Sequence, residues 1–231
     1  MKTNKQSISK PKLVQEAREL VKGCQSSTMS PADYLGRLRL FHSFHVEQLD
    51  SEINAFLEYV YTWKPSVICE IGTFRGGTLF LLSRVSPGDS LLISIDIELP
   101  KERQQAYQEF ARERQRIYCI QGNSFLENTY TKVLRILKGK LIDLLFIDGD
   151  HSFFGVANDY VKFSPLVRPG GHIVFHDINK DSYLKTGEKS TTNVGKVPIF
   201  WEALKQTTNN FLEIINDPDQ DGYGIGIIKK E

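Results

Sequence analysis

The chain has 231 residues, 40% of them hydrophobic, so one α/β domain with a terminal addition and an ample core is expected. The formal net charge of +1 gives no reason to expect a nucleic acid or an anionic membrane as a partner. Three widely spaced cysteines, a polar start and no apolar run of ~18 residues predict a cytoplasmic protein with reduced thiols, no signal peptide and no membrane span.

The first quarter of the chain is expected to form a polar tail over residues 1–12 and then helices. Ser30-Pro31 is typical of a helix N-cap followed by proline at the first helical position. Apolar residues at helical spacing predict three helices, over residues 13–21, 34–44 and 46–61. We therefore divide the chain into a tail with a helical extension, residues 1–64, and a main domain, residues 65–231.

The main domain begins with a strand, a glycine-rich turn and a helix. Residues 67–71 form a short apolar run that predicts a buried parallel strand, and the turn contains Gly72, Gly76 and Gly77. Phe74 occupies the position where a dinucleotide fingerprint needs glycine, and Thr78 the position where a phosphate-binding loop needs lysine. Glu70, just inside the strand end, would repel phosphate and suits a cation, such as the sulfonium and amino group of S-adenosylmethionine.

The remaining segments alternate between strand and helix, as in a doubly wound sheet. Strands are expected over residues 90–95, 117–120, 142–147 and 173–175, and helices over 101–116, 130–137, 152–163 and 197–207. The long polar segment 179–196 has the character of a lid or binding loop. Apolar runs at 211–215 and 223–228, separated by a turn, predict a terminal hairpin.

Four segments together resemble the class I S-adenosylmethionine-dependent methyltransferases: 70–78, 94–96, 146–151 and 168–177. The nearest branch is the metal-dependent O-methyltransferases, which include macrolide-sugar methyltransferases and cephalosporin-hydroxylase-like proteins. The resemblance covers residues 65–231 and implies a Rossmann-like, mostly parallel seven-stranded sheet with a C-terminal antiparallel hairpin. It also implies methyl transfer to a hydroxyl group of a small metabolite, a sugar or natural-product intermediate. In this family, N-terminal helices cover the substrate side or build a dimer contact, so a homodimer is compatible with it.

The donor site implied by the resemblance surrounds the glycine-rich turn. Asp96 follows the second strand about 20 residues after the turn, where an acid bonds ribose hydroxyls. The junction after the third strand contacts adenine in the family, and Asn123 stands here where aspartate is common. The expected cofactor-binding residues are Glu70, Gly72, Thr73, Phe74, Gly76, Gly77, Thr78, Asp96, Asn123, Ser124 and Asp148.

The catalytic residues are expected where the fourth and fifth strands end, because ligands of open parallel sheets bind beyond the carboxyl ends of the strands. Asp148 and Asp177 should share a pocket there, and a hard cation such as Mg²⁺ would relieve their repulsion. The family carries an acidic pair after the fifth strand. Here the pair is His176-Asp177, so His176 is a third candidate ligand, Mn²⁺ is an alternative ion, and a metal-free site stays open.

His151 is the candidate general base, because relatives carry a histidine three residues after the acid that corresponds to Asp148. An imidazole with a pKa near neutrality can take the hydroxyl proton as the methyl group is transferred. Asp150 is expected to orient His151 or to bind the metal. Asp159 is expected to face solvent or to pair with a basic neighbour, and His172 to be structural.

Two other functions stay open at this point. Asp148-Gly-Asp150 matches the Asp-x-Asp metal site of nucleotide-sugar glycosyltransferases, although the glycine-rich turn has no role in that interpretation. A non-catalytic S-adenosylmethionine-binding module is the second. A nucleic-acid amino-methyltransferase is disfavoured, because no Asn-Pro-Pro-Tyr block follows the fourth strand.

Overall fold

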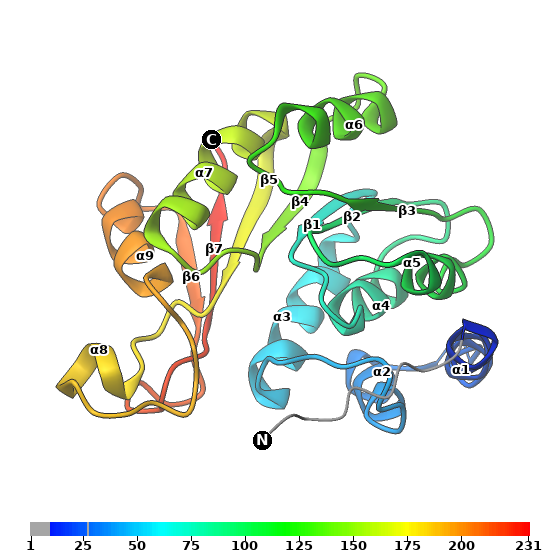
Figure 1. Cartoon of the computed structure of the whole chain (residues 1–231), viewed down its shortest axis with the longest axis horizontal. Coiled ribbons are helices and arrows are strands. Elements are labelled where there is room, and N and C mark those ends of the chain that lie inside the picture. The colour runs from blue at the N-terminus through cyan, green and yellow to red at the C-terminus, as the bar shows by residue number, and fades with distance from the viewer. Residues whose placement is uncertain (1–9, 27) are drawn as a thin grey trace.

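One sheet of seven strands organises the protein, in the order β3-β2-β1-β4-β5-β7-β6 (Figure 1). The computed structural model describes residues 10–26 and 28–231, so the tail predicted over residues 1–12 lies mostly outside the described residues. All strands are parallel except β7, which runs antiparallel to both of its neighbours. The strands are β1 (Val67–Ile71), β2 (Leu91–Asp96), β3 (Arg116–Gln121), β4 (Ile142–Ile147), β5 (Val167–His176), β6 (Phe211–Ile214) and β7 (Ile225–Lys229). The predicted fold class, including the antiparallel C-terminal hairpin, is confirmed.

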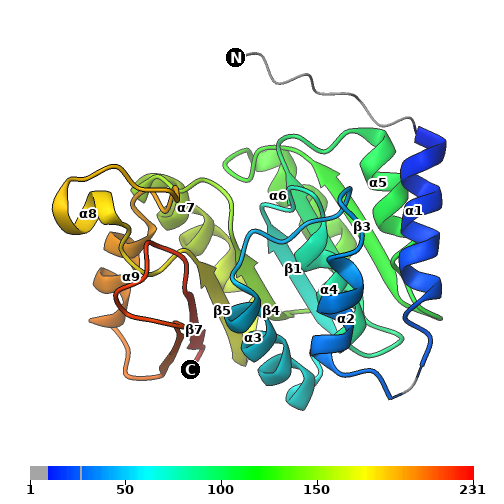
Figure 2. The ribbon, with the colours of Figure 1, turned by 90° about the horizontal axis from the view of Figure 1, so that it is seen from below.

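Helices cover both faces of the sheet. One face carries α1 (Lys10–Lys22), α2 (Pro31–Leu38), α3 (Asp50–Trp63), α4 (Gly77–Val85) and α5 (Lys101–Gln108), with α1 beside α5 (Figure 2). The other face carries α6 (Glu127–Leu137), α7 (Phe153–Phe163) and α9 (Val197–Lys205). The short α8 (Ser182–Thr186) lies outside both layers (Figure 1). Among the described residues, no helix is both long and apolar enough to cross a bilayer.

Successive side chains of the central strands enter opposite cores, because side chains alternate across a strand. In β1, Ile68 packs with α1–α5, whereas Cys69 packs with α6, α7 and α9. All five residues of β1 are buried, as expected for a strand with helices on both faces. Fully burying a side chain such as Ile68 stabilises the fold by about 1.5–3 kcal/mol.

The segment between α2 and α3 departs from the predicted helices. Ser30 caps α2 as expected, and its hydroxyl accepts the backbone N–H of Asp33. The helix ends at Leu38 rather than at residue 44, and α3 begins at Asp50 rather than at residue 46. Arg39 explains the break, because its guanidinium donates to the carbonyls of Val46 and Gln48. Residues 39–49 therefore form an irregular segment.

The predicted loop 179–196 contains α8 and is tied to the β6–β7 connection. Asp221 accepts the backbone N–H groups of Ser182 and Thr191, at 2.6 and 2.9 Å. Its carboxylate also accepts the hydroxyl groups of Ser190 and Thr191. These bonds hold the second half of the loop above the carboxyl end of β5.

Candidate active site

The turn after β1 places glycine where the backbone needs it. Gly72 has φ +90°, and a Cβ atom there would lie 1.8 Å from the carbonyl oxygen of Asp148. Gly76 precedes α4 with φ +77°, and a Cβ on Gly77 would lie 2.2 Å from the carbonyl oxygen of His45. At these glycines protein atoms occupy the space that a Cβ atom would need, because β1, β4 and the N-terminal segment converge there.

Asp96 holds this glycine turn (residues 72–77) to the end of β2. Its carboxylate accepts the backbone N–H of Phe74 at 2.7 Å and that of Glu98 at 2.7 Å. The Phe74 side chain remains 53% exposed, beside the opening of the cavity described below. Asp96 is thus fixed where the second and first strands end, in the position expected for an acid that meets a ribose.

Glu70 is fully buried inside β1, and neither of its carboxylate oxygens has a hydrogen-bond partner within the described residues. Burial raises the pKa of Glu70 well above its ordinary value, and the charges of Asp148 and Asp96 raise it further, against the effect of the Thr73 hydroxyl. The Thr73 hydroxyl lies 2.5 Å from that of Ser94, underneath the turn. The Thr73 side chain is therefore directed into the protein, although it was predicted to contact the cofactor.

Asn123 and Ser124 line a smaller cavity of about 260 Å³ between the ends of β1, β2 and β3. Asp96 lines it too, so this cavity continues the site on the expected adenine side. The Asn123 side-chain oxygen accepts the backbone N–H of Phe125 at 2.9 Å. The amide nitrogen forms no hydrogen bond within the described part of the chain.

Asp159 contradicts its prediction, because it is fully buried rather than exposed. Neither carboxylate oxygen has a hydrogen-bond partner among the described residues, and burial raises the pKa of Asp159 to about 6. The residue lies on the inner face of α7, between Val156 and Phe163, which are also buried. That helical spacing was visible in the sequence and would have predicted the burial.

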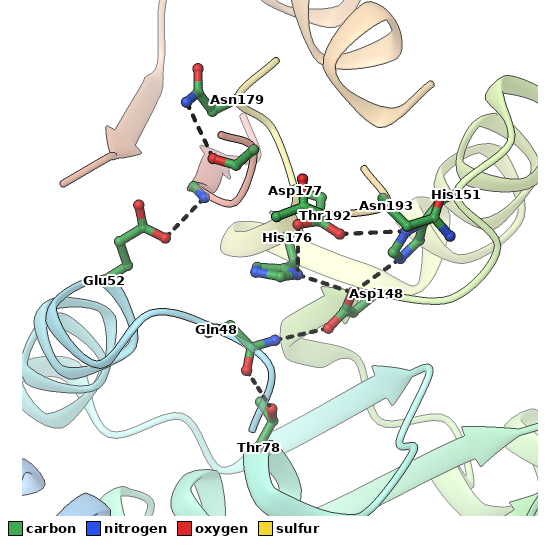
Figure 3. A network of polar contacts seen from close by, with 12 residues as sticks. Gln48, Glu52, Thr78, Asp148, His151, His176, Asp177, Asn179, Thr192 and Asn193 are labelled. Carbon is green, nitrogen blue, oxygen red and sulfur yellow. Dashed lines mark hydrogen bonds and ion pairs between the residues drawn. The ribbon is translucent and has the colours of Figure 1, made fainter. Parts of the chain in front are cut away.

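Four side chains meet at the carboxyl ends of β4 and β5, forming the acid–imidazole cluster of Asp148, His151, His176 and Asp177 (Figure 3). One Asp148 oxygen lies 3.4 Å from Nε2 of His151 and 3.3 Å from Nδ1 of His176. Asp177 lies 3.4 Å from Nδ1 of each imidazole. Nδ1 of His151 is also 2.6 Å from the carbonyl oxygen of Asn193, in the tied loop.

The two aspartates of the cluster stabilise the protonated, positively charged forms of His151 and His176. Burial lowers the pKa of His151, but Asp148 and Asp177 outweigh it and raise that pKa to about 9. The same balance raises the pKa of His176 to about 10. Burial raises the pKa of Asp148, whereas the two imidazoles lower it, and the net pKa falls below the ordinary value. Asp177 has φ +62°, a left-handed backbone that a non-glycine residue adopts only where its surroundings impose it.

The arrangement fits a divalent cation with a changed ligand set. One oxygen of Asp148, one ring nitrogen of His151 and one oxygen of Asp177 lie within 4.8 Å of one another. The predicted set contained His176 in place of His151. His176 is buried, and its Nε2 atom has no partner within the described residues. Two carboxylates and one imidazole suit Mn²⁺ or Mg²⁺ among common ions.

A single cavity of about 430 Å³ joins the two halves of the site. Its first wall consists of Gly72, Phe74 and Asp96, and its second wall of Asp148, His151, His176 and Asp177. Tyr223 and the loop residues Thr191, Thr192 and Asn193 close it. The glycine turn and the cluster therefore open on the same space.

Residues 69–178 match the family model of the methyltransferase domain. This segment is similar to a methyltransferase domain, in agreement with the predicted resemblance to class I S-adenosylmethionine-dependent methyltransferases. The chain is also 32% identical over 143 residues to uncharacterized protein R132 of Acanthamoeba polyphaga mimivirus. That match covers 60% of this chain and 61% of R132, so the chain spans about three fifths of this relative.

Solved structures share the fold of this chain. The O-methyltransferase from Bacillus cereus, in complex with SAH, has a TM-score of 0.59 at 15% identity, covering 98% of this chain and 94% of its own. The O-methyltransferase TomG from Streptomyces achromogenes, in complex with SAM and involved in tomaymycin synthesis, has a TM-score of 0.54 at 16% identity, with coverages of 98% and 92%. At these identities the likeness establishes the fold.

Gln48 is a polar residue at the site that the sequence did not indicate. Gln48, 3% exposed, donates from Nε2 to Asp148 at 2.9 Å and accepts the hydroxyl of Thr78 at 3.3 Å (Figure 3). Thr78 was expected to bind the cofactor, but its hydroxyl is engaged with this amide. No motif surrounds Gln48, so only its burial could have indicated a role.

Asp150 is separated in space from Asp148. Its carboxylate accepts the backbone N–H of Ser152 at 2.8 Å, at the start of α7. It lines the neighbouring cavities and not the one that contains Asp148. The prediction that Asp150 orients His151 or binds the metal therefore has no supporting contact among the described residues.

Proposed function

We propose that this protein is an S-adenosylmethionine-dependent methyltransferase that methylates a hydroxyl group of a small metabolite. The observation that carries the proposal is the shared cavity, with the glycine turn and Asp96 on one wall and the acid–imidazole cluster on the other. A donor on the first wall would present its methyl group toward an acceptor on the second. The SAM and SAH complexes of the two O-methyltransferase relatives support this choice of donor.

The donor would be held mainly by fixed polar groups. Each oxygen of Asp96 accepts one backbone N–H and retains a lone pair for a ribose hydroxyl. The free amide nitrogen of Asn123 is available for the adenine edge in the adjoining cavity. Glu70 lies buried behind the turn and lines neither cavity, so its predicted contact with the donor has no support among the described residues. Asp96 and Asn123 together are consistent with a nucleoside donor.

His151 would accept the proton of the acceptor in its neutral form, and because Asp148 and Asp177 raise its pKa to about 9, that form is a minority at neutral pH and the rate should rise with pH toward 9. The Nδ1–H of His151 donates to the Asn193 carbonyl, which leaves Nε2 as the basic nitrogen. Asp148, 3.4 Å from Nε2, would stabilise the imidazolium that forms. A positioned base of this kind contributes about 10²–10⁴-fold to the rate. Alignment of sulfur, methyl group and acceptor oxygen would contribute more, about 7–11 kcal/mol for well-oriented reactants.

A metal ion fits the same residues. Asp148, Asp177 and His151 would hold it, since their donor atoms already lie within 4.8 Å of one another. When bound, a divalent ion supplies Lewis acidity that lowers the pKa of a hydroxyl group. His151 cannot act as metal ligand and as base through the same nitrogen. Activity that requires a metal ion would therefore indicate that His151 is a ligand, and activity without one that His151 is the base. The glycosyltransferase alternative gains no support, because Asp148 and Asp150 face different cavities.

The test is a methyl-transfer screen with isotopically labelled S-adenosylmethionine and fractionated metabolite pools, run with and without EDTA and with Mn²⁺ or Mg²⁺ restored. We expect label in a hydroxyl-bearing product, and S-adenosylmethionine binding by calorimetry without binding of NAD or a UDP-sugar. Asp96→Ala should weaken donor binding by roughly tenfold or more, because it removes a charge-assisted hydrogen-bond acceptor. Binding of a UDP-sugar in preference to S-adenosylmethionine would overturn the proposal.

A further inference from the structure

A second cavity, of about 620 Å³, lies away from the candidate active site. It is bounded by the carboxyl-terminal ends of α3 and α4, by the α1–α2 connection and by the segment after α5. The nine residues of α4 separate it by about 12 Å from the glycine turn, given a rise of ~1.5 Å per residue. Its size falls within the range of small-molecule sites.

Three basic side chains line this cationic cavity, namely Lys64, Arg84 and Arg112. Arg84 is only 3% exposed, and its guanidinium donates to the Phe110 carbonyl and to the Ser83 hydroxyl. Burial and the neighbouring Arg112 lower the pKa of Arg84 to about 10, so it still carries its charge at neutral pH. The cavity therefore contains a buried cation beside a second cation.

No carboxylate forms an ion pair with these basic side chains within the described part of the chain. The Nε atom of Arg112 is buried there without a partner. The residues outside the described ranges, 1–9 and Ser27, include no Asp or Glu that could supply one. A buried charge without a partner is costly, so its retention calls for a bound counter-charge.

Capping of helix ends does not account for all of this charge. Arg112 donates to the carbonyl of Ser86 at the end of α4, and Lys64 follows α3. A helix end carries about half a negative elementary charge. Two such ends and Glu113, the acidic residue lining the cavity, offset about two of the three positive charges. A net positive charge remains.

The other side of the cavity is apolar and aromatic. Tyr34 is buried and Tyr61 is exposed, and both line the space together with Met29, Val21, Val85 and Pro87. Aromatic and aliphatic side chains of this kind pack against the body of a small ligand. Guanidinium groups recognise phosphate or carboxylate oxygens through paired N–H donors.

We propose that the cationic cavity binds a small molecule with an oxyanion group, phosphate or carboxylate, attached to an aromatic or apolar body. The oxyanion would lie against Arg84, Arg112 and Lys64, and the body against Tyr34 and Tyr61. This site is separate from the donor and acceptor sites and does not depend on the proposed methyl transfer.

Phenyl phosphate is the probe, with benzoate, inorganic phosphate and phenol as comparisons, each titrated by calorimetry and by thermal unfolding of the full chain. We expect saturable binding of phenyl phosphate and a raised Tm, with weaker binding of inorganic phosphate and none of phenol. Comparison of phenyl phosphate with benzoate identifies the preferred oxyanion. Absence of saturable binding of both aromatic anions would overturn the proposal.

Two variants keep the test specific. Lys64→Gln and the double variant Lys64→Gln with Arg112→Gln should weaken binding by roughly tenfold or more for each removed cation. Lys138→Gln is the matched control, because Lys138 is an exposed lysine with a left-handed backbone at the end of α6, as Lys64 is at the end of α3. S-adenosylmethionine binding should be unchanged in all three. Equal affinity of the wild type and the Lys64 variants for phenyl phosphate would contradict the proposal.

Discussion

Gln48 Nε2 donates a 2.9 Å hydrogen bond to Asp148 Oδ2, although 100 positions separate the two residues in the chain. The contact joins the irregular segment before α3 to the end of β4. Because Asp148 Oδ1 faces both imidazoles, this bond fixes which oxygen is presented to His151 and His176. Gln48 thus acts on the cluster by orienting Asp148.

Replacing Gln48 with leucine should lower kcat for methyl transfer by about 10–100-fold, because a hydrogen bond to a charged group contributes ~1.5–3 kcal/mol. The dissociation constant for S-adenosylmethionine should change little, since Gln48 does not line the donor cavity. Steady-state kinetics and calorimetry on one preparation check both values. Thr78→Val is the control, because it removes the partner of Gln48 Oε1 and leaves the bond to Asp148. A Gln48→Leu enzyme with wild-type kcat would rule out the orienting role.

Replacing Asp148 and replacing Asp150 with asparagine should have different effects on the affinity for Mn²⁺. Asp148→Asn and Asp177→Asn should weaken Mn²⁺ binding by tenfold or more, because each removes one of the three clustered donors. Asp150→Asn should bind Mn²⁺ like the wild type, since its carboxylate faces another cavity. Calorimetric titration with Mn²⁺ after EDTA treatment measures the three affinities. An equal loss in Asp150→Asn would restore the Asp-x-Asp interpretation.

Glu52 should prove important for stability rather than for chemistry. This buried residue on α3 accepts the backbone N–H groups of Asn216 and Gly224 and the side-chain amide of Gln220. Glu52→Ala should lower the free energy of unfolding by about 2–4 kcal/mol, because buried donors lose their acceptor. Urea denaturation measures the change. Glu58→Ala, on an exposed part of the same helix, should cost less than about 0.5 kcal/mol, and a similar cost in both variants would refute this assignment.

His172 should make stability depend on pH. Burial, with help from Lys229 and Arg168, lowers the pKa of His172 to about 4 from an ordinary value of 6.5. Between pH 4 and pH 6.5, the unfolded chain therefore binds a proton at His172 that the folded chain does not bind. The His172 contribution is fully present above pH 6.5 and is lost as the pH falls toward 4, by roughly 3 kcal/mol in total.

The measurement compares the wild type with His172→Gln by urea denaturation at several pH values between 4 and 7. The difference in unfolding free energy between the two proteins should shrink as the pH falls. Other titrating groups contribute equally to both proteins and cancel in this difference. A difference that stays constant across the range would show that His172 is not held neutral.

Much of the site could be predicted because its residues follow strand ends. Asp96, Asp148 and His176 each stand at the carboxyl end of a short apolar run, and parallel strands bring those ends to one edge of the sheet. Helix boundaries were less predictable where a side chain competes with the helix, as Arg39 does after α2. Which residues bind donor, acceptor and metal stays a prediction.

The sequence by itself determined the order of strands and helices, the glycine turn after β1 and the acids at the strand ends, because each follows from local spacing and residue chemistry. Only the tertiary structure decided that Gln48 reaches Asp148 and that His151 joins His176 beside the two acids. It also decided that three basic residues share a cavity. These contacts join positions far apart in the chain, and their distances depend on how whole elements pack, which local residue patterns do not encode.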